Sequence, residues 1–214
     1  MTKRILTTFA LLGLIGTAAH GQGTVQFAVG ADSRLWIEGT TNLRRWTCKA
    51  AVLDAAIDVD VGFREPADFP RYLRKVQVQV PVAELKCGRE QMDRSLRKAL
   101  KADDSTPITH ILATFDVVNG GATDSVTVHT IGTLTLAGRE NRVKMEVTMT
   151  RLSEDGVEAR GELPILMTDY GVTPPTAMLG IIRAGDRVVV KFALTLRPQT
   201  IAAVTALCTS APRE

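Results

Sequence analysis

Histidine is scarce in this sequence, and the usual catalytic patterns are missing. Of the three histidines among 214 residues, His110 and His129 alone lie beyond residue 21, each singly in a strand-like run. An enzyme site normally combines a nucleophile, a base and an orienting group, or a set of metal ligands. The sequence has no GxSxG, no HExxH and no glycine loop that could cradle a phosphate. We therefore expect a protein that is not an enzyme and holds no metal.

Aromatic residues are also few, at 5% of the chain, although 45% of all residues are hydrophobic. The core must then consist largely of Val, Leu, Ile and Ala, and β-branched residues favour strands. The 26 basic and 23 acidic residues are interspersed, and the formal net charge is +3. A nucleic-acid binder would gather basic residues and stacking aromatics on one face. We therefore expect no nucleic-acid partner.

Residues 1–21 have the pattern of a signal peptide. A positive start is followed by the apolar run Ile5–Ile15 and by small residues at positions 19 and 21. The apolar run is shorter than the roughly 20 residues that span a bilayer, and an uncleaved anchor is the alternative. We predict cleavage before Gln22, a folded domain over 22–198 and a tail over 199–214. The expected location is the periplasm or the extracellular medium.

Three cysteines in an exported chain leave one unpaired. Cys48 lies in a strand-like run and Cys87 between a strand and a helix, whereas Cys208 lies in a small-residue tail. The spacing shows no CxxC and no zinc pattern. We predict a disulfide between Cys48 and Cys87, with Cys208 free, which in the chain-entropy model would stabilise the fold by about 4 kcal/mol.

Alternation of apolar and polar residues indicates strands that each bury one face. The clearest case runs from Val143 to Met149 and follows the β-rich run Gly132–Leu136 across a glycine-containing connection, 137–141. This pattern predicts a hairpin of two long antiparallel strands. Across the chain, the apolar stripes expected to face one interior comprise Val76, Val78, Val80, Ile111, Phe115, Val143, Met145, Val147, Met149, Phe192 and Leu194.

One segment changes period. In 89–101, Met92, Leu96 and Leu100 recur every four residues, which predicts a short amphipathic helix whose basic residues either meet anionic lipid or simply face water. Segments 63–71 and 168–185, each with two prolines, are expected to be loops. The predicted fold is all-β, an antiparallel lipocalin-like β-barrel of about eight strands with one short amphipathic helix; a sandwich is the alternative.

Several blocks, taken in order, resemble the YceI-like family of exported lipid-binding barrels. The resemblance covers about residues 33–196. It rests on the ordered set of blocks, since no single block is specific. The chain departs from the family at Arg44 and Arg45, where relatives often have a histidine and an acid, so we carry over no head-group contact there. The matching blocks are 33–46, 92–101, 107–108 with Phe115, 132–138, 161–163, 168–172 and 188–196.

The resemblance implies a barrel whose apolar interior holds a long isoprenoid or fatty chain, without chemistry and without a cofactor. On the residues alone, a ligand-filled lumen and a solidly filled core are equally open. The family resemblance favours the lumen, lined by the apolar stripes named above. Asp169 and Tyr170, in a loop at one end of the barrel, could close the mouth or bind a polar head; a turn role for Asp169 is the alternative.

Two functions of different class follow. The first is an exported, non-enzymatic binding protein for a long-chain lipid, serving transport, storage or sequestration. The second is an exported barrel with a filled core that acts as a protein-interaction or stress-tolerance module. A lipid or other hydrophobic small molecule is the expected partner, and transient membrane contact and homodimer formation stay open.

Overall fold

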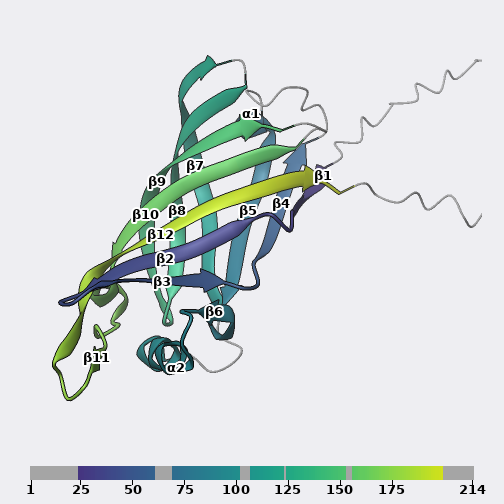
Figure 1. Ribbon diagram of the computed structural model, residues 1–214. Coiled ribbons are helices and arrows are strands. Elements are labelled where there is room, and N and C mark those ends of the chain that lie inside the picture. The colour runs from purple at the N-terminus through teal and green to yellow at the C-terminus, as the bar shows by residue number, and fades with distance from the viewer. Residues whose placement is uncertain (1–23, 61–68, 102–106, 123, 153–155, 200–214) are drawn as a thin grey trace, which may run out of the picture.

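The computed structural model describes residues 24–60, 69–101, 107–122, 124–152 and 156–199 (Figure 1). The predicted signal peptide, most of the predicted tail and Cys208 lie outside the described residues. Within them, no helix has the length and apolar character needed to cross a membrane.

Eight antiparallel strands close into a barrel, which confirms the predicted fold (Figure 1). The ring closes because β1 pairs with both β4 and β12. Each strand of the ring pairs with a neighbour on both sides, so the ring has no end strand of the kind that an open sheet has. In ring order the strands are β1 (Thr24–Val29), β4 (Asp54–Asp60), β5 (Leu73–Pro81), β7 (Pro107–Ala122), β8 (Ser125–Leu136), β9 (Arg139–Arg151), β10 (Val157–Leu166) and β12 (Ile182–Pro198).

A second branch extends the sheet from β12 through β2 (Arg34–Thr41), β3 (Arg45–Ala50) and the short β6 (Leu85–Lys86). The 17-residue strand β12 pairs with β2 over its first part and with β1 at its end. Strands β1 and β2 therefore lie end to end along β12. At the break between them, Gly30 N donates to Thr195 O at 2.7 Å, and Thr195 N donates to Ser33 Oγ at 2.9 Å.

The predicted hairpin is present as β8 and β9, with an unbroken register from Ser125–Thr150 to Leu136–Arg139. Its turn is two residues, Ala137 and Gly138, with φ of 51° and 75°. Positive φ at both central positions is the signature of the type I′ turn that matches strand twist. The connection expected over 137–141 is therefore too long, since Arg139 to Asn141 already pair in the ladder.

The predicted helix is α2 (Glu90–Ala99), and Asp93 Oδ1 accepts a 2.7 Å bond from Cys87 N just ahead of it. The predicted Cys48–Cys87 disulfide is formed and joins β3 to the residues just before α2. Two loop predictions need correction. Of the segment 63–71, residues 63–68 lie outside the described residues, and the rest belongs to a helical turn, α1 (Phe69–Tyr72). The segment 168–185 holds most of a 3₁₀ turn (Met167–Tyr170), the short strand β11 (Thr176–Ala177) and the first residues of β12.

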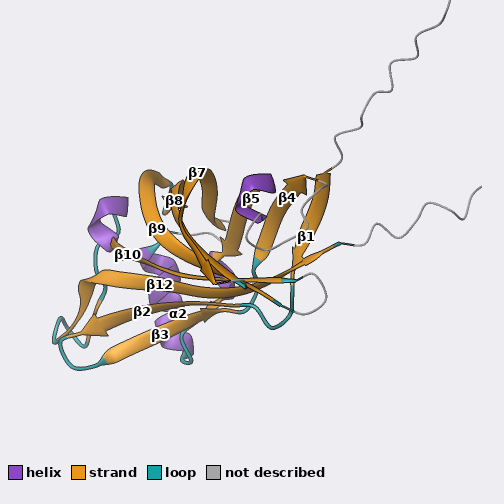
Figure 2. Cartoon of the chain, turned by 90° about the horizontal axis from the view of Figure 1, so that it is seen from above, coloured by secondary structure: helices purple, strands orange, loops and turns teal. Residues whose placement is uncertain are grey.

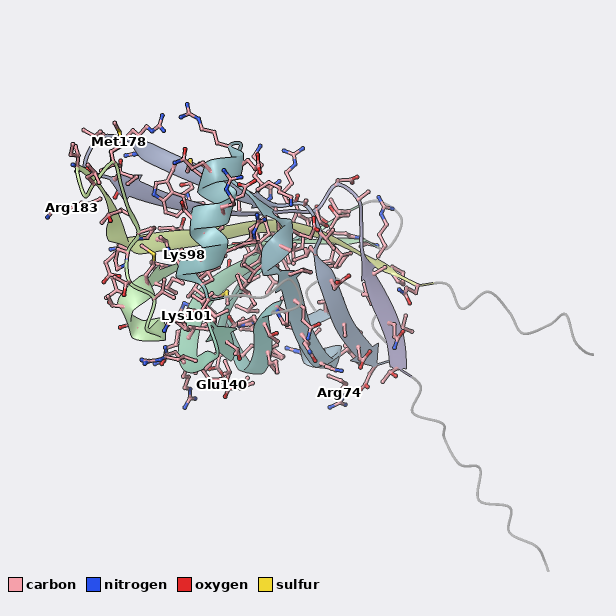
Figure 3. All side chains as sticks on the ribbon, turned by 90° about the horizontal axis from the view of Figure 1, so that it is seen from below. Arg74, Lys98, Lys101, Glu140, Met178 and Arg183 are labelled. Carbon is pink, nitrogen blue, oxygen red and sulfur yellow. A yellow bond between two sulfur atoms is a disulfide. The ribbon has the colours of Figure 1, made fainter. Side chains whose placement is uncertain are left out.

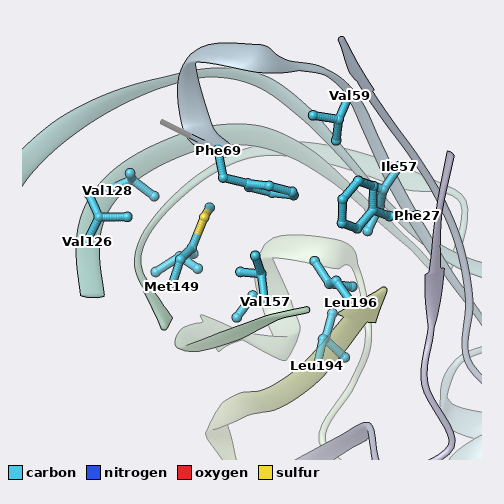
Figure 4. Close-up of a cluster of buried hydrophobic side chains, with 12 residues drawn as sticks. Phe27, Ile57, Val59, Phe69, Val126, Val128, Met149, Val157, Leu194 and Leu196 are labelled. Atoms are coloured by element: carbon cyan, nitrogen blue, oxygen red, sulfur yellow. The ribbon is translucent and has the colours of Figure 1, made fainter. Parts of the chain in front are cut away.

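The buried side chains form two clusters along the barrel. The first holds α1 in place, because Phe69 packs edge-on against Phe27 with ring centroids 5.2 Å apart (Figure 4). The second lies toward α2 and includes Leu85, Leu134 and Val172. Helix α2 lies at one end of the barrel, below the strands in Figure 1 and behind them in the view of Figure 2. The space between the clusters contains the candidate site.

Candidate ligand-binding lumen

A cavity runs through the barrel interior between the two clusters. The cavity has a volume of about 200 Å³. All the space between its walls that is free of protein atoms, counted out into the open mouth, amounts to about 1580 Å³. Its walls come from most strands of the ring, from Phe69 of α1 and from Leu96 and Leu100 at the α2 end. Such a hollow differs from the packed interior of a typical small barrel.

Nine of the eleven predicted lining residues border this cavity. On β9, Met145, Val147 and Met149 all project inward, because the unbroken register with β8 keeps alternate residues on one face. Met149 and Phe69 project into the same interior space (Figure 4). The other six predicted residues at the cavity are Val76, Val78, Val80, Phe115, Phe192 and Leu194.

The structure corrects the expectation for Ile111, whose side chain is 47% exposed on the outer face. The register between β7 and β8 shifts between Leu112 and Thr114. One extra residue at such a bulge moves the following side chains to the opposite face. Before the bulge, Ile108, His110 and Leu112 point inward, and after it Phe115 does.

Val143 also departs from the expectation, in a smaller way. It is buried, at 7% exposure, but packs into the second cluster and does not border the cavity. Its pairing partner on β8 is Gly132. The imidazole of His110 lies over that glycine, where an added Cβ would come within 2.5 Å of Nε2. This stretch of the interior is therefore filled by side chains.

Two lining residues carry polar groups apart from the indole of Trp46: Thr130 and His110. Thr130 Oγ1 donates to Met145 O at 3.1 Å and is thereby satisfied within the wall. His110 Nε2 is buried and has no hydrogen-bond partner. Burial lowers the pKa of His110 from its ordinary value of 6.5, because the low-dielectric surroundings disfavour the charged form. The lumen is accordingly almost wholly apolar and carries no charge at neutral pH.

Asp169 and Tyr170 do not border the cavity. Tyr170 is 2% exposed and belongs to the second cluster; burial, and then the charge of Asp169, raise the pKa of its phenol. Asp169 is exposed, and its carbonyl accepts a 3.0 Å bond from Asn141 Nδ2. The turn that holds both is fixed to β12, since Asp186 accepts bonds from Thr168 N (2.9 Å) and Thr168 Oγ1 (2.6 Å). Their predicted contact with a polar head remains a prediction.

Several lining residues were not expected from the sequence. The sequence predicts a loop at Phe69 and only a family block at Trp46, whose ring packs over Gly39 and reaches the cavity. Leu96 and Leu100 were visible as the apolar stripe of the helix. That stripe predicts a buried face but does not identify the surface that covers it, which is the end of the lumen.

The described residues contain no cluster of His, Cys, Asp or Glu suited to a metal ion. A closed antiparallel barrel around an apolar cavity defines a class of fold that can enclose a hydrophobic small molecule. A family model described as the YceI-like domain matches residues 20–196, so this chain belongs to the YceI-like family. A search of curated proteins returns no sequence match.

Solved structures share the fold at low sequence identity. BcnA from Burkholderia cenocepacia is 18% identical, with a TM-score of 0.61 over 78% of this chain and 99% of that one. A polyisoprenoid binding domain from Saccharophagus degradans is 15% identical, with a TM-score of 0.58 over 83% and 99%. The YceI protein of Campylobacter jejuni is 15% identical, with a TM-score of 0.53 over 72% and 84%. At these identities the likeness concerns the fold.

Proposed function

We propose that this protein is an exported, non-enzymatic binding protein that holds a long-chain isoprenoid or fatty lipid in the barrel lumen, for transport, storage or sequestration. One observation carries the proposal: an interior cavity lined by 32 residues, of which His110 and Thr130 are the polar ones besides Trp46. Thr130 is already satisfied by the wall. Such a lining has few hydrogen-bonding groups for a polar ligand and a large apolar surface for a hydrocarbon chain.

The binding free energy should depend more on the length of the lipid chain than on its head group. Each methylene removed from water contributes about 0.8 kcal/mol, so a chain that follows the barrel axis gains affinity with every carbon it buries. The interior side chains include three methionines, Met145, Met149 and Met167, whose flexible thioethers adapt to irregular apolar ligands. The neighbouring structure from S. degradans is described as a polyisoprenoid binding domain, which supports the same class of ligand here.

The cavity also weighs against the alternative of a barrel with a filled core. Binding rather than catalysis is supported by the lining, in which His110 is the one titratable side chain and has no nucleophile or acid beside it. Export is supported by the signal-peptide pattern of residues 1–21.

The test is organic extraction of the protein purified from its native host, followed by mass spectrometry. We expect a long-chain lipid in near-stoichiometric amount, with an unrelated exported protein purified in parallel as the control. Protein that repeatedly yields no lipid, and that gains none when incubated with a polyprenyl alcohol or a long-chain fatty acid, would contradict the proposal.

A further inference from the structure

Four large apolar side chains are exposed together at one end of the barrel. Leu43 is 68% exposed, Met178 68%, Leu179 106% and Ile181 66%. Leu43 belongs to the turn between β2 and β3, and the other three to the hairpin between β11 and β12. Isolated exposed apolar residues are ordinary, but a group of large ones at one tip marks a surface that meets something other than water. We call these four residues the apolar tip.

The two segments of the apolar tip are fixed to each other. Asn42 Nδ2 donates to Ile181 O at 2.9 Å, Arg183 N donates to Asn42 Oδ1 at 2.9 Å, and Asn42 N donates to Arg183 O at 3.1 Å. The side chain and backbone of one asparagine therefore join the turn to the hairpin. Leu43 follows Asn42 directly, so it lies beside the hairpin as a consequence of these bonds.

The hairpin has a defined shape that pushes its apolar side chains outward. Met178 and Leu179 have φ of 50° and 55°, a region that residues with a side chain adopt at some cost, and Gly180 follows with φ of 88°. Bonds from Gly180 N to Ala177 O and from Ile181 N to Met178 O close the turn at 3.2 and 3.1 Å. Asn or Gly would adopt these positive φ angles at a lower cost than Met178 and Leu179 do.

The charges around the apolar tip are almost all positive. Segments 40–45 and 173–187 contain four arginines (44, 45, 183 and 187) and one acid, Asp186, whose carboxylate is engaged by Thr168. Helix α2 lies at the same end of the molecule, and its last turn and the residue that follows the helix add Arg97, Lys98 and Lys101 (Figures 1 and 3). The two acids of α2 lie in its first turn, where Glu90 pairs with Arg94 and Asp93 accepts a bond from Cys87 N. An apolar protrusion within a basic surface is the arrangement that binds anionic membranes, through burial of the apolar part and attraction of the basic part.

We propose that this end of the protein docks on a lipid bilayer with anionic head groups, with the apolar tip inserted into the interface and the surrounding arginines and lysines facing the phosphates. A second copy of this chain fits less well, because a two-fold contact would bring the same basic surfaces together. A stable protein interface also buries about 800 Å² per partner, more than four protruding side chains offer. Docking would bring α2, whose Leu96 and Leu100 border the cavity, against the membrane surface.

The experiment is sedimentation of the full chain with vesicles, which reads membrane binding whether or not the lumen is filled. We expect binding to vesicles of equal parts phosphatidylcholine and phosphatidylglycerol, little binding to phosphatidylcholine alone, and weakening at high salt because salt screens exposed charges. Leu179→Ser should weaken binding by about tenfold or more, the worth of one large apolar side chain. Lys98→Glu with Lys101→Glu should also weaken it.

The matched control is Val118→Ser, since Val118 is likewise exposed, at 51%, but lies toward the far end of β7. It should bind vesicles like the wild type. Equal binding by Leu179→Ser and wild type, equal binding to both vesicle types, or no vesicle binding at all would each overturn the proposal. A wild-type dimer that Leu179→Ser turns into a monomer, without vesicle binding, would assign the tip to self-association instead.

Discussion

Two apolar regions of this molecule differ in what encloses them. The lumen is surrounded by a closed sheet, and its lining meets other side chains or a narrow free space. The apolar tip is held out by a turn at which Leu179 is 106% exposed. We propose that residues of the same chemistry serve different partners here: an enclosed channel suits one long molecule, whereas a protruding point among arginines suits a flat, charged surface. Substitutions that affect one region and spare the other test this division.

The largest effect should come from the disulfide, which joins β3 to the residues before α2 at one end of the barrel. Replacing both Cys48 and Cys87 by Ala should lower the free energy of unfolding by about 4 kcal/mol, because the open chain gains entropy in a loop of 39 residues. Denaturant unfolding with and without reductant measures it. Equal stability of the wild type in both conditions would show that the bond does not support this end.

The second prediction compares one side chain from each region. Phe69→Ala should cost about 3 kcal/mol, since Phe69 is 1% exposed and packs on Phe27 beside the lumen. Leu179→Ala should change stability by no more than about 0.5 kcal/mol, because that side chain touches water rather than protein. Urea unfolding of both variants at neutral pH is the measurement. Similar costs for the two would mean that the tip is packed in solution.

A smaller effect on stability should depend on pH and come from the lumen alone. Burial lowers the pKa of His110 in the folded lumen, whereas the unfolded chain protonates near the ordinary value of 6.5. The unfolded state therefore binds more protons as the pH falls through that value, and stability should decrease between about pH 7.5 and 5.5. The carboxyls of Glu38, Asp60 and Asp186, whose pKa values are lowered, act below this range.

The control for this prediction is His110→Leu, which removes the titrating group from the lumen and keeps the wall apolar. Its stability should depend less on pH over the same range. Equal pH dependence in wild type and variant would assign the effect to groups elsewhere. The arginines around the apolar tip stay charged throughout this range and should contribute nothing to the difference.

Comparison of β9 with β7 explains which lumen residues the sequence could predict. On β9 the alternation of Val143 to Met149 is unbroken, so each apolar residue faces inward as its position requires. On β7 a bulge between Leu112 and Thr114 reverses the faces. On β7 neither glycine nor proline marks that bulge, and the glycine beside it, Gly132, lies on the partner strand β8. Periodicity read along β7 alone therefore places Ile111 on the wrong side of the sheet.

Tertiary contacts account for the other differences. The helical turn at Phe69 is only four residues long and exists because its ring packs on Phe27, a residue 42 positions earlier in the chain. The apolar tip is likewise formed by two segments that Asn42 joins across 139 residues. Local periodicity cannot report contacts at such separations. The fold class was predictable, since long alternating strands and one helix leave few other architectures.

The most direct test of the account applies one substitution to both regions. Met145→Glu places a carboxylate in the lumen, and Met178→Glu places the same group at the apolar tip. Met145 is half-buried beside the open cavity, so a carboxylate there keeps more of its hydration than a charge on the buried His110 Nε2 would. Met145→Glu should therefore remain folded with a modest change in thermal midpoint. In a solidly packed core, the same buried charge would cost several kcal/mol, a large part of a domain's stability.

The measurement is the amount of lipid extracted per mole of each purified variant, determined by mass spectrometry beside the thermal midpoint. We predict that Met145→Glu folds and carries no lipid, whereas Met178→Glu carries as much as the wild type. Unfolding of Met145→Glu together with no lipid in the wild type, or undiminished lipid in folded Met145→Glu, would contradict the claim that the barrel interior is the binding site.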